Sequence, residues 1–209
     1  MVGLREHQKA GRRRRILEAA RHHFLASGYE AATIEAIAET AEVSAVTVYN
    51  YYGTKRGLLL ALVAQSDDIL ITKINRMLGD ASDDPIEAIT RFAETIRDHV
   101  LSYLDRPIWR YVIATSVIEG SSHFGHAFAE LDREMARLLG RLLETLERRG
   151  ALHGVRDCAA VGETLFKLQN ARFIEFIADD AMTDQEMAHL VRSDLVLILD
   201  KRLAVTEPA

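Results

Sequence analysis

The segment from Val43 to Lys55 combines side-chain types that suit contacts with DNA. Its sequence, VSAVTVYNYYGTK, places three tyrosines, two threonines, a serine and an asparagine among small apolar residues. Hydroxyl and amide groups donate hydrogen bonds to phosphate oxygens, and small or aromatic side chains contact the methyl group of thymine. The segment is therefore a candidate DNA-binding surface.

The same segment has the composition of a β-strand, but its surroundings favour a helix. β-branched and aromatic residues favour strands, yet the rest of the chain has helical periodicity, and a lone strand would leave its backbone groups unpaired. We therefore predict a short helix from Ser44 to Tyr52, with Ser44 as its N-cap. Its inward face carries Val48 and Tyr52. Its outward face carries Val46, Thr47, Asn50 and Tyr51, with Ala45 and Tyr49 on the flanks.

Helical periodicity along the chain predicts an all-α fold with about nine helices. The first expected helix, RRRRILEAARHHFLASGY, is stopped by Gly28, and the second, TIEAIAETA, begins after the N-cap Thr33. Three further helices are expected over about Lys55–Leu78, about Asp157–Ile177 and about Asp184–Leu203, the last after a capping box from Thr183 to Glu186. Pro85 and Pro107 mark the first turns of two other helices, and one more helix ends before Gly150.

Two short helices joined by a tight turn are the layout of a helix-turn-helix. The stretch ILEAARHHFLASGYEAATIEAIAETAEVSAVTVYNYYGTKRGLLLAL resembles the DNA-binding domain of the tetracycline-repressor (TetR) family. The shared pattern is ILxAAxxxFxxxGY, then TxxxIAxxAxVS, then xxTVYxYYxxKxxLL, and it covers about Arg14 to Leu62. The resemblance implies a DNA-binding domain over residues 1–54 with a basic N-terminal arm, and a ligand-binding and dimerisation domain over residues 55–209.

The resemblance also implies which residues contact DNA. The expected phosphate contacts are Thr33, Thr47, Asn50, Tyr51 and Lys55, and the expected contacts to base edges are Ala45, Val46 and Tyr49. The wider DNA-binding set includes Ser44, Glu35 and the basic arm of Arg12, Arg13, Arg14 and Arg15. Because family members often carry a long polar side chain at the position of Ala45, we expect specificity to depend on methyl contacts, DNA shape and the arm.

Two acidic residues depart from the family pattern. Glu42 stands where a glycine is usual in the turn, so either the backbone is strained there or the turn has another geometry. Glu35 faces the expected DNA side, where a carboxylate repels phosphate unless it accepts a hydrogen bond from a cytosine amino group.

The charge of the chain is unevenly distributed, and its composition excludes several classes of protein. The net charge is −5, but Met1 to Arg56 contains nine basic and six acidic residues, whereas the remainder contains 17 basic and 25 acidic residues. A basic head on an acidic body favours DNA binding at the head. A single cysteine excludes an intramolecular disulfide, and no apolar run is long enough for a signal peptide or a membrane span. We expect a cytoplasmic protein with no membrane partner.

The C-terminal body offers a candidate ligand pocket and a candidate dimer interface. Core packing is the default interpretation of the mixed aromatic and polar residues His99, Tyr103, Trp109, Tyr111 and Thr115, whereas the resemblance to the TetR family implies a ligand pocket in this part of the chain. The last two helices carry apolar residues that suit an intrachain core, whereas the resemblance implies that they form a four-helix homodimer interface. These residues are Val161, Leu165, Leu168, Phe176, Met187, Leu190, Val191, Leu195 and Ile198.

No cofactor, metal ion or catalytic centre is expected. His123 and His126 lie three residues apart but have no cysteine or carboxylate at ligand spacing. Cys158 has no recognisable base, and we find no phosphate-binding loop.

The resemblance implies a ligand-responsive transcriptional regulator, more often a repressor, that binds a palindromic operator as a homodimer and is released by a small-molecule effector. The alternative is a helical small-molecule-binding or interaction protein that does not bind DNA.

Overall fold

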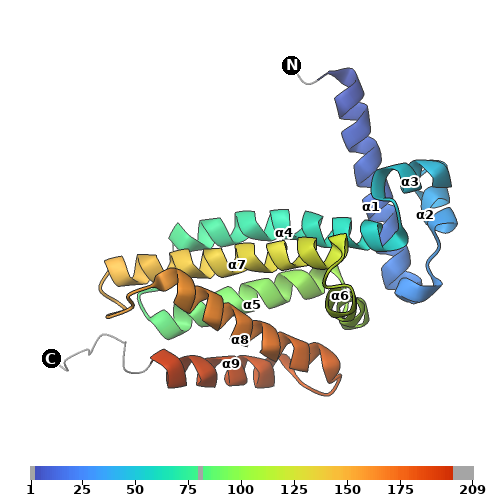
Figure 1. Cartoon of the computed structure of the whole chain (residues 1–209). Helices are drawn as coiled ribbons and strands as arrows, with labels where there is room; N and C mark the ends of the chain where they lie inside the picture. The colour runs from blue at the N-terminus through green and yellow to red at the C-terminus, as the bar shows by residue number, and fades with distance from the viewer. Residues whose placement is uncertain (1–2, 80–81, 200–209) are drawn as a thin grey trace. The chain divides into compact units, whose positions relative to one another are not determined.

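The computed structural model describes residues 3–79 and 82–199, and within these it contains nine α-helices (Figure 1). The prediction of an all-α fold is confirmed. In chain order the helices are α1 (Leu4–Ala31), α2 (Ile34–Thr40), α3 (Ala45–Tyr52), α4 (Lys55–Gly79), α5 (Pro85–Tyr103), α6 (Arg106–Ile118), α7 (His123–Arg148), α8 (Cys158–Ala178) and α9 (Asp184–Leu199).

The helices form two compact units. One unit comprises Met1–Ser66 with Tyr103–Phe128, and the other comprises Asp67–Ser102 with Ala129–Ala209. The first unit thus contains more than the helix-turn-helix, because it includes the first half of α4 and the whole of α6. The predicted division after residue 54 is a division of function, and it stays a prediction.

The first unit has a small apolar core between α1, α2 and α3. Ile16 and Phe24 of α1, Ile37 of α2 and Val48 of α3 are all buried there. Helix α1 is interrupted at Gly28, whose φ of 81° lies in the region that glycine tolerates best, so the predicted stop is confirmed as a kink. Short α2 and α3 are stabilised by packing in this core, since helices of seven and eight residues are unstable alone.

In the second unit α7 and α8 cross at a glycine contact. A Cβ added at Gly162 would lie 2.6 Å from the backbone nitrogen of Gly140. Position 162 therefore requires glycine for the backbones to approach this closely, whereas a Cβ added at Gly140 would lie 3.3 Å from the Ala159 Cα. Gly162 therefore permits close approach of α7 and α8 within one chain.

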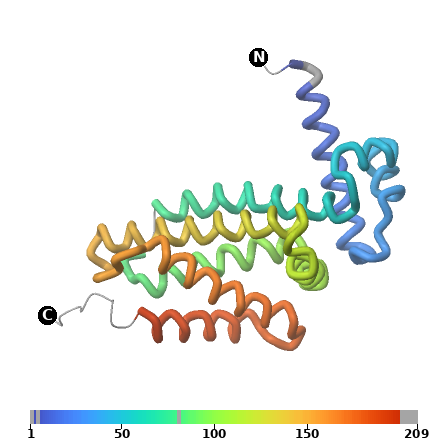
Figure 2. Tube along the Cα trace, viewed as in Figure 1, coloured from blue at the N-terminus to red at the C-terminus, as the bar shows by residue number. Residues whose placement is uncertain are grey.

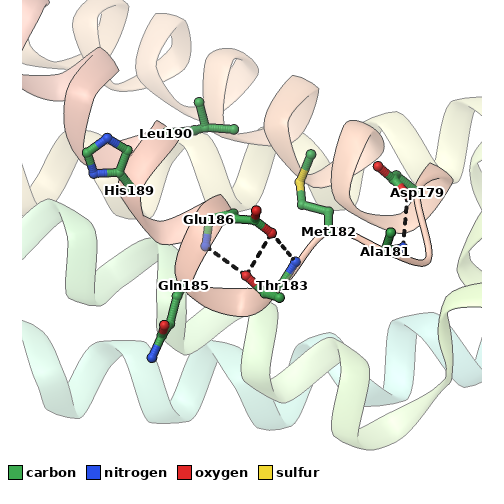
Figure 3. A pocket seen from close by; sticks show the side chains of 8 residues that line it. All are labelled: Asp179, Ala181, Met182, Thr183, Gln185, Glu186, His189 and Leu190. Carbon is green, nitrogen blue, oxygen red and sulfur yellow. Dashed lines mark hydrogen bonds between the residues drawn. The ribbon is translucent and has the colours of Figure 1, made fainter.

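The trace in Figure 2 shows α8 and α9 running in opposite directions through a short turn. The predicted capping box begins α9: the Thr183 backbone N–H donates to Glu186 Oε2 at 2.8 Å, and the Glu186 N–H donates to Thr183 Oγ1 at 3.2 Å. Figure 3 shows these bonds beside the pocket at this turn. Glu186 Oε2 accepts hydrogen bonds from the backbone N–H and the hydroxyl of Thr183, and these two bonds lower the pKa of Glu186 below its usual value. The predicted helix end at Leu203 lies outside the described residues.

Within the described ranges, no helix combines the length and apolar character needed to cross a membrane.

Candidate nucleic-acid interface

Helices α2 and α3 both begin at capped residues predicted to contact DNA. Thr33 Oγ1 accepts a hydrogen bond from the Ala36 N–H at 3.2 Å, and Ser44 Oγ accepts one from the Thr47 N–H at 3.2 Å. Each hydroxyl uses a lone pair in its cap, and the exposed Thr33 hydroxyl still has an O–H group to donate. Ser44 Oγ lies 2.9 Å from Thr47 Oγ1, which links the two hydroxyls at the start of α3.

The turn between α2 and α3 contains a strained residue. Glu42 has a φ of 56°, and among the described residues no other non-glycine residue has a positive φ. Its N–H donates to the Glu39 carbonyl at 3.1 Å and the Val43 N–H donates to the Ala38 carbonyl at 3.0 Å, which is the Schellman ending of a helix. Of the two turn geometries expected at Glu42, the structure has the strained one, in which a side chain occupies the usual glycine position.

Helix α3 presents the predicted side chains outward. Val48 is buried, whereas Val46 is 66% exposed and Tyr49 is 47% exposed. Asn50 is also exposed, and Ala45, Thr47 and Tyr51 are partly exposed. Tyr52 turns inward and its hydroxyl donates to the Arg13 carbonyl at 3.4 Å. The outward face therefore combines the apolar side chain of Val46, the aromatic ring of Tyr49 and the amide of Asn50, as helical periodicity predicts.

A tight connection that the sequence interpretation missed joins α3 to α4. Gly53 ends α3 with a φ of 71°. A Cβ added at Gly57 would lie only 2.1 Å from the carbonyl oxygen of Tyr52. The spacing of two glycines after the tyrosines is the signal that could have identified this turn. It fixes the position of α3 relative to the start of α4.

Lys55, predicted to contact phosphate, is engaged within the chain. Its Nζ donates to the carbonyl oxygens of Tyr29, Glu30 and Ala32 at 2.9, 3.1 and 3.0 Å. An ammonium group has three protons, and these three carbonyls at the end of α1 account for all of them. The ammonium also lies 4.5 Å from the centroid of the Tyr29 ring. The phosphate role of Lys55 stays a prediction, and the geometry favours a positioning role.

The basic residues Arg12 to Arg15 are helical, as predicted for the segment RRRRILEAARHHFLASGY. They lie within α1, which begins at Leu4 rather than at Arg12, because the preceding LREHQKAG contains good helix formers and no proline. All four arginines are exposed. Arg15 Nε donates a hydrogen bond to the Ala41 carbonyl at 3.3 Å, and Arg14 Nε forms an ion pair with Glu18 Oε1 at 3.7 Å. A helix is about 10 Å wide and a minor groove about 6 Å, so phosphate contact is the more suitable role.

Helix α6 is joined to α1 and α4 by contacts that the sequence interpretation also missed. The ring of Tyr111 on α6 stacks on Tyr29 of α1, with centroids 3.8 Å apart. Burial and the neighbouring Tyr111 hydroxyl raise the pKa of Tyr29. The guanidinium of Arg56, at the start of α4, pairs with the carboxylate of Glu119, which follows α6. These contacts lie beside Lys55 and fix α6 against the helix-turn-helix.

The residues of the predicted pocket are divided between the two units. Tyr103, Trp109, Tyr111 and Thr115 belong to the first unit and His99 to the second. Trp109 and Thr115 are buried in α6, and the Tyr103 hydroxyl donates to Gln65 Oε1 at 2.8 Å. Their participation in one ligand pocket stays a prediction.

The predicted dimer residues fall into two groups. Leu165, Phe176, Met187, Val191 and Leu195 are buried within the single chain, where α8 and α9 contact each other. Val161, Leu168 and Leu190 are partly exposed and Ile198 is exposed. The apolar stripe of each helix thus contributes mainly to the intrachain core. The exposed large apolar side chains of these two helices are Ile174, Val196, Leu197 and Ile198, and of these four only Ile198 belongs to the predicted set.

Comparison with known proteins identifies the N-terminal segment. Residues 16–62 match the family described as bacterial regulatory proteins, tetR family. The chain is 28% identical over 88 residues to the HTH-type transcriptional regulator TcmR of Streptomyces glaucescens, a match that spans 42% of this chain and 38% of TcmR. It is 27% identical over 143 residues to the uncharacterized HTH-type transcriptional regulator YvkB of Bacillus subtilis, spanning 66% of this chain and 69% of YvkB.

The fold of the whole chain also has solved counterparts. The TetR-family repressor FadR of Thermus thermophilus, solved in complex with lauroyl-CoA, superposes with a TM-score of 0.72 at 24% identity, covering 94% of this chain and 98% of FadR. Identity at that level shows the fold alone. Residues 16–62 of this chain therefore match the tetR family of bacterial regulatory proteins, and the chain as a whole has the fold of solved TetR-family regulators.

Proposed function

We propose that this chain represses transcription by binding a palindromic operator as a homodimer, and that a small-molecule effector releases it. The observation that supports DNA binding most directly is the exposed face of α3. The side chains of Val46, Tyr49 and Asn50 are exposed on a helix too short to be stable alone. A helix held in this way can lie in the major groove.

The division of charge supports the same orientation on DNA. The first unit contains 11 basic and eight acidic residues, and the second contains 15 basic and 23 acidic residues. A positive surface attracts the phosphate backbone, and an acidic unit is repelled by it. We infer that the duplex meets the end of the protein that carries α3 and Arg12 to Arg15.

Homodimerisation is supported by exposed apolar side chains on α8 and α9. Leu197 is 83% exposed on α9, where its chain neighbours Val196 and Ile198 are also exposed, and Ile174 is exposed on α8. In a homodimer with twofold symmetry the same patch would be used on both subunits. Two copies of α3 would then contact half-sites about 34 Å apart.

Effector control is supported by the continuity of α4. The helix begins at Lys55 beside the helix-turn-helix and ends at Gly79 within the second unit. An effector bound more tightly by one position of α4 than by another would change the separation of the two recognition helices.

The test is binding of the purified protein to the DNA upstream of its own gene, measured by fluorescence anisotropy at several salt concentrations. We expect affinity to fall by about 0.9 log units per log unit of salt for each phosphate contact. Tyr49→Ala should weaken binding by about tenfold or more, because the ring lies on the outward face. Tyr49→Phe keeps the ring and separates its contribution from that of the hydroxyl.

Val117→Ala is the control, since Val117 is also exposed, at 75%, but lies on α6. Salt-insensitive binding, or unchanged affinity in Tyr49→Ala, would favour the alternative of a helical ligand-binding or interaction protein without a DNA site.

A further inference from the structure

The N-terminal part of α1 extends past the core of the helix-turn-helix. Ile16 is the first buried residue of α1 among those described, and from residue 6 to residue 15 no described side chain is buried. Figures 1 and 2 show this part of the helix projecting beyond α2 and α3. Residues 4–15, which we call the overhang, form about 18 Å of helix at about 1.5 Å per residue.

The base of the overhang is held against the ends of α2 and α3. Tyr52 is the last residue of α3, and its hydroxyl donates to the Arg13 carbonyl at 3.4 Å. Arg15 Nε donates at 3.3 Å to the carbonyl of Ala41, which ends α2. Burial raises the pKa of Tyr52 and the Arg13 guanidinium beside its hydroxyl opposes that shift, so the Arg13 side chain lies on the α3 side of α1.

The face of α1 that packs on α2 and α3 continues into the overhang as a row of cations. Ile16 and Ala20 mark the packed face, and both are fully buried. Arg13 precedes Ile16 by three residues and Lys9 precedes it by seven, which are spacings that keep side chains on one face of a helix. Arg12 lies on the flank of that face. We call Lys9, Arg12 and Arg13 the basic stripe, and all three are exposed.

The charge of the basic stripe has no acidic partner. Across the described part of the chain, no carboxylate forms an ion pair with any of its three cations. The other two arginines of the run do have partners, since Arg14 pairs with Glu18 and Arg15 donates to Ala41. The run of four arginines is therefore divided into two that are used within the chain and two that belong to the stripe.

The overhang as a whole is strongly positive. Residues 6–15 include five basic residues and one acidic residue, Glu6. Lys9 and Arg13 lie four residues apart, where like charges repel each other and destabilise a helix. A polyanion beside the stripe would remove this repulsion.

Duplex DNA carries the complementary charge in a regular array. Each strand has one phosphate per about 3.4 Å of helix axis. Lys9 and Arg13 lie about 6 Å apart along α1, so their long side chains can reach phosphates of the same strand. A membrane surface suits the overhang less well, because helices that lie on membranes bury an apolar face, and residues 6–15 (EHQKAGRRRR) contain no large apolar residue.

We propose that the basic stripe binds the phosphate backbone of duplex DNA beyond the base pairs that α3 contacts. The inference rests on the proposed function and extends its DNA site to Lys9, which lies outside the run of arginines expected to contact DNA. It assigns Arg12 and Arg13 to the backbone and leaves Arg14 with Glu18. Contacts of this kind position the protein and add affinity that does not depend on base sequence.

Salt titrations of charge-removing variants test the stripe. The probes are the DNA upstream of the protein's own gene and a duplex of equal length and unrelated sequence, with binding measured by fluorescence anisotropy. Lys9→Gln and Arg12→Gln should each lower the slope of log affinity against log salt by about 0.9 in magnitude. On both duplexes each variant should weaken binding by roughly three- to tenfold at physiological salt.

Arg14→Gln is the matched control, because it removes the same charge from the same run on another side of α1. Lys73→Gln removes an exposed lysine from α4 in the second unit. Both controls should keep the parent slope, and all four variants should keep the circular dichroism of the parent because the side chains are exposed. An unchanged slope in Lys9→Gln, or an equal loss in Arg14→Gln, would overturn the inference.

Ala10→Pro tests whether the stripe has to be helical. Proline in a helix interior removes a hydrogen bond and clashes with the carbonyl four residues earlier, here that of Glu6, while every charge is kept. We expect Ala10→Pro to lose the Lys9 contact and to lower the salt slope by about 0.9 in magnitude. A slope equal to that of the parent would overturn the placement of Lys9 on a rigid overhang.

Ethylation interference locates the contact on the DNA. Phosphates whose ethylation weakens binding of the parent but not of Lys9→Gln are those that Lys9 holds. We expect these phosphates to lie outside the base pairs whose contacts are lost in Tyr49→Ala. Phosphates at the same base pairs would contradict a contact beyond the reach of α3.

Tyr49→Ala and Lys9→Gln separate the inference from the proposed function. Weaker binding in Tyr49→Ala with an unchanged slope in Lys9→Gln leaves the proposed function standing and overturns the inference. A lower slope in Lys9→Gln without any preference for the upstream DNA keeps the stripe as a backbone site and removes the operator. Binding to anionic phospholipid vesicles that Lys9→Gln abolishes, with DNA affinity unchanged, would assign the stripe to a membrane surface and overturn the inference.

Discussion

The ammonium of Lys55 lies 4.5 Å from the centre of the Tyr29 ring and donates to the Tyr29 carbonyl at 2.9 Å. Residues 26 positions apart are thereby joined at the end of α1. A cation at a helix C-terminus interacts favourably with the helix dipole as well as with individual carbonyls. Because Tyr29 also stacks on Tyr111, Lys55 connects the start of α4 with α1 and α6.

Replacing Lys55 by methionine should destabilise the protein without removing a phosphate contact. Hydrogen bonds to charged groups contribute about 1.5 to 3 kcal/mol, so we expect a loss of that size in the free energy of unfolding by urea. The slope of log affinity against log salt should stay unchanged, since all three ammonium protons are used within the chain. A slope lower in magnitude by about 0.9 would instead assign Lys55 to a phosphate.

Glycine in place of Glu42 should stabilise the protein. A side chain in the left-handed region costs roughly 1 to 2 kcal/mol, part of which is offset by the greater freedom of glycine in the unfolded chain. We expect Glu42→Gly to raise the free energy of unfolding by about 0.5 to 1 kcal/mol. Glu42→Gln keeps the φ of 56° and removes only the charge, so it should leave stability nearly unchanged. Equal gains in both variants would attribute the effect to charge.

Alanine at Gly57 should disturb the connection between α3 and α4. The added Cβ would lie 2.1 Å from the Tyr52 carbonyl oxygen, a backbone atom that moves only if the turn moves. We expect a loss of about 2 kcal/mol or more in thermal or urea unfolding, accompanied by weaker DNA binding. Gly11→Ala is the control: it meets nothing within 4 Å and should be neutral or stabilising by up to about 1 kcal/mol. A neutral Gly57→Ala would contradict the geometry.

Stability should fall as pH rises through the acidic range because of Asp67. Its pKa is raised to about 7 in the folded protein by burial, by Asp132 and by Asp68, so the folded state holds a proton that the unfolded state releases near pH 4. The contribution of protonated Asp67 to the free energy of unfolding is fully present below about pH 4 and is lost by about pH 7. Asp67→Asn should match the parent at low pH and exceed it by a few kcal/mol above about pH 7.

Urea unfolding at a series of pH values measures this difference, with the exposed Asp68→Asn as control. A gain in Asp67→Asn that is the same at every pH would mean that its carboxyl group titrates normally in the folded state.

A charge at Leu197 should prevent dimerisation. Leu197 is 83% exposed on α9, so Leu197→Glu should fold normally as a single chain and sediment as a monomer where the parent sediments as a dimer. Ile118→Glu changes an equally exposed residue, 82%, on α6 and should leave the dimer intact. A parent protein that is monomeric at all concentrations would remove the proposed interface.

The sequence alone determined the features that depend on neighbouring residues. Thr33, Ser44 and Thr183 cap helices at the predicted positions because a cap joins groups only two or three residues apart. The inward position of Val48 follows from helical periodicity within one short segment. The segment of α3 has the composition of a strand but forms a helix, because a lone strand in a helical chain would leave its backbone groups unpaired.

Only the tertiary structure decided which distant groups meet. The partners of Lys55 lie in another helix, and the buried or exposed state of Leu165 depends on whether α9 covers it, which an apolar stripe does not specify. Asp67 and Asp132 lie 65 positions apart and look like ordinary surface acids in the sequence. Their shared burial is a property of packed helices, because burial and mutual repulsion arise only when the chain brings them together.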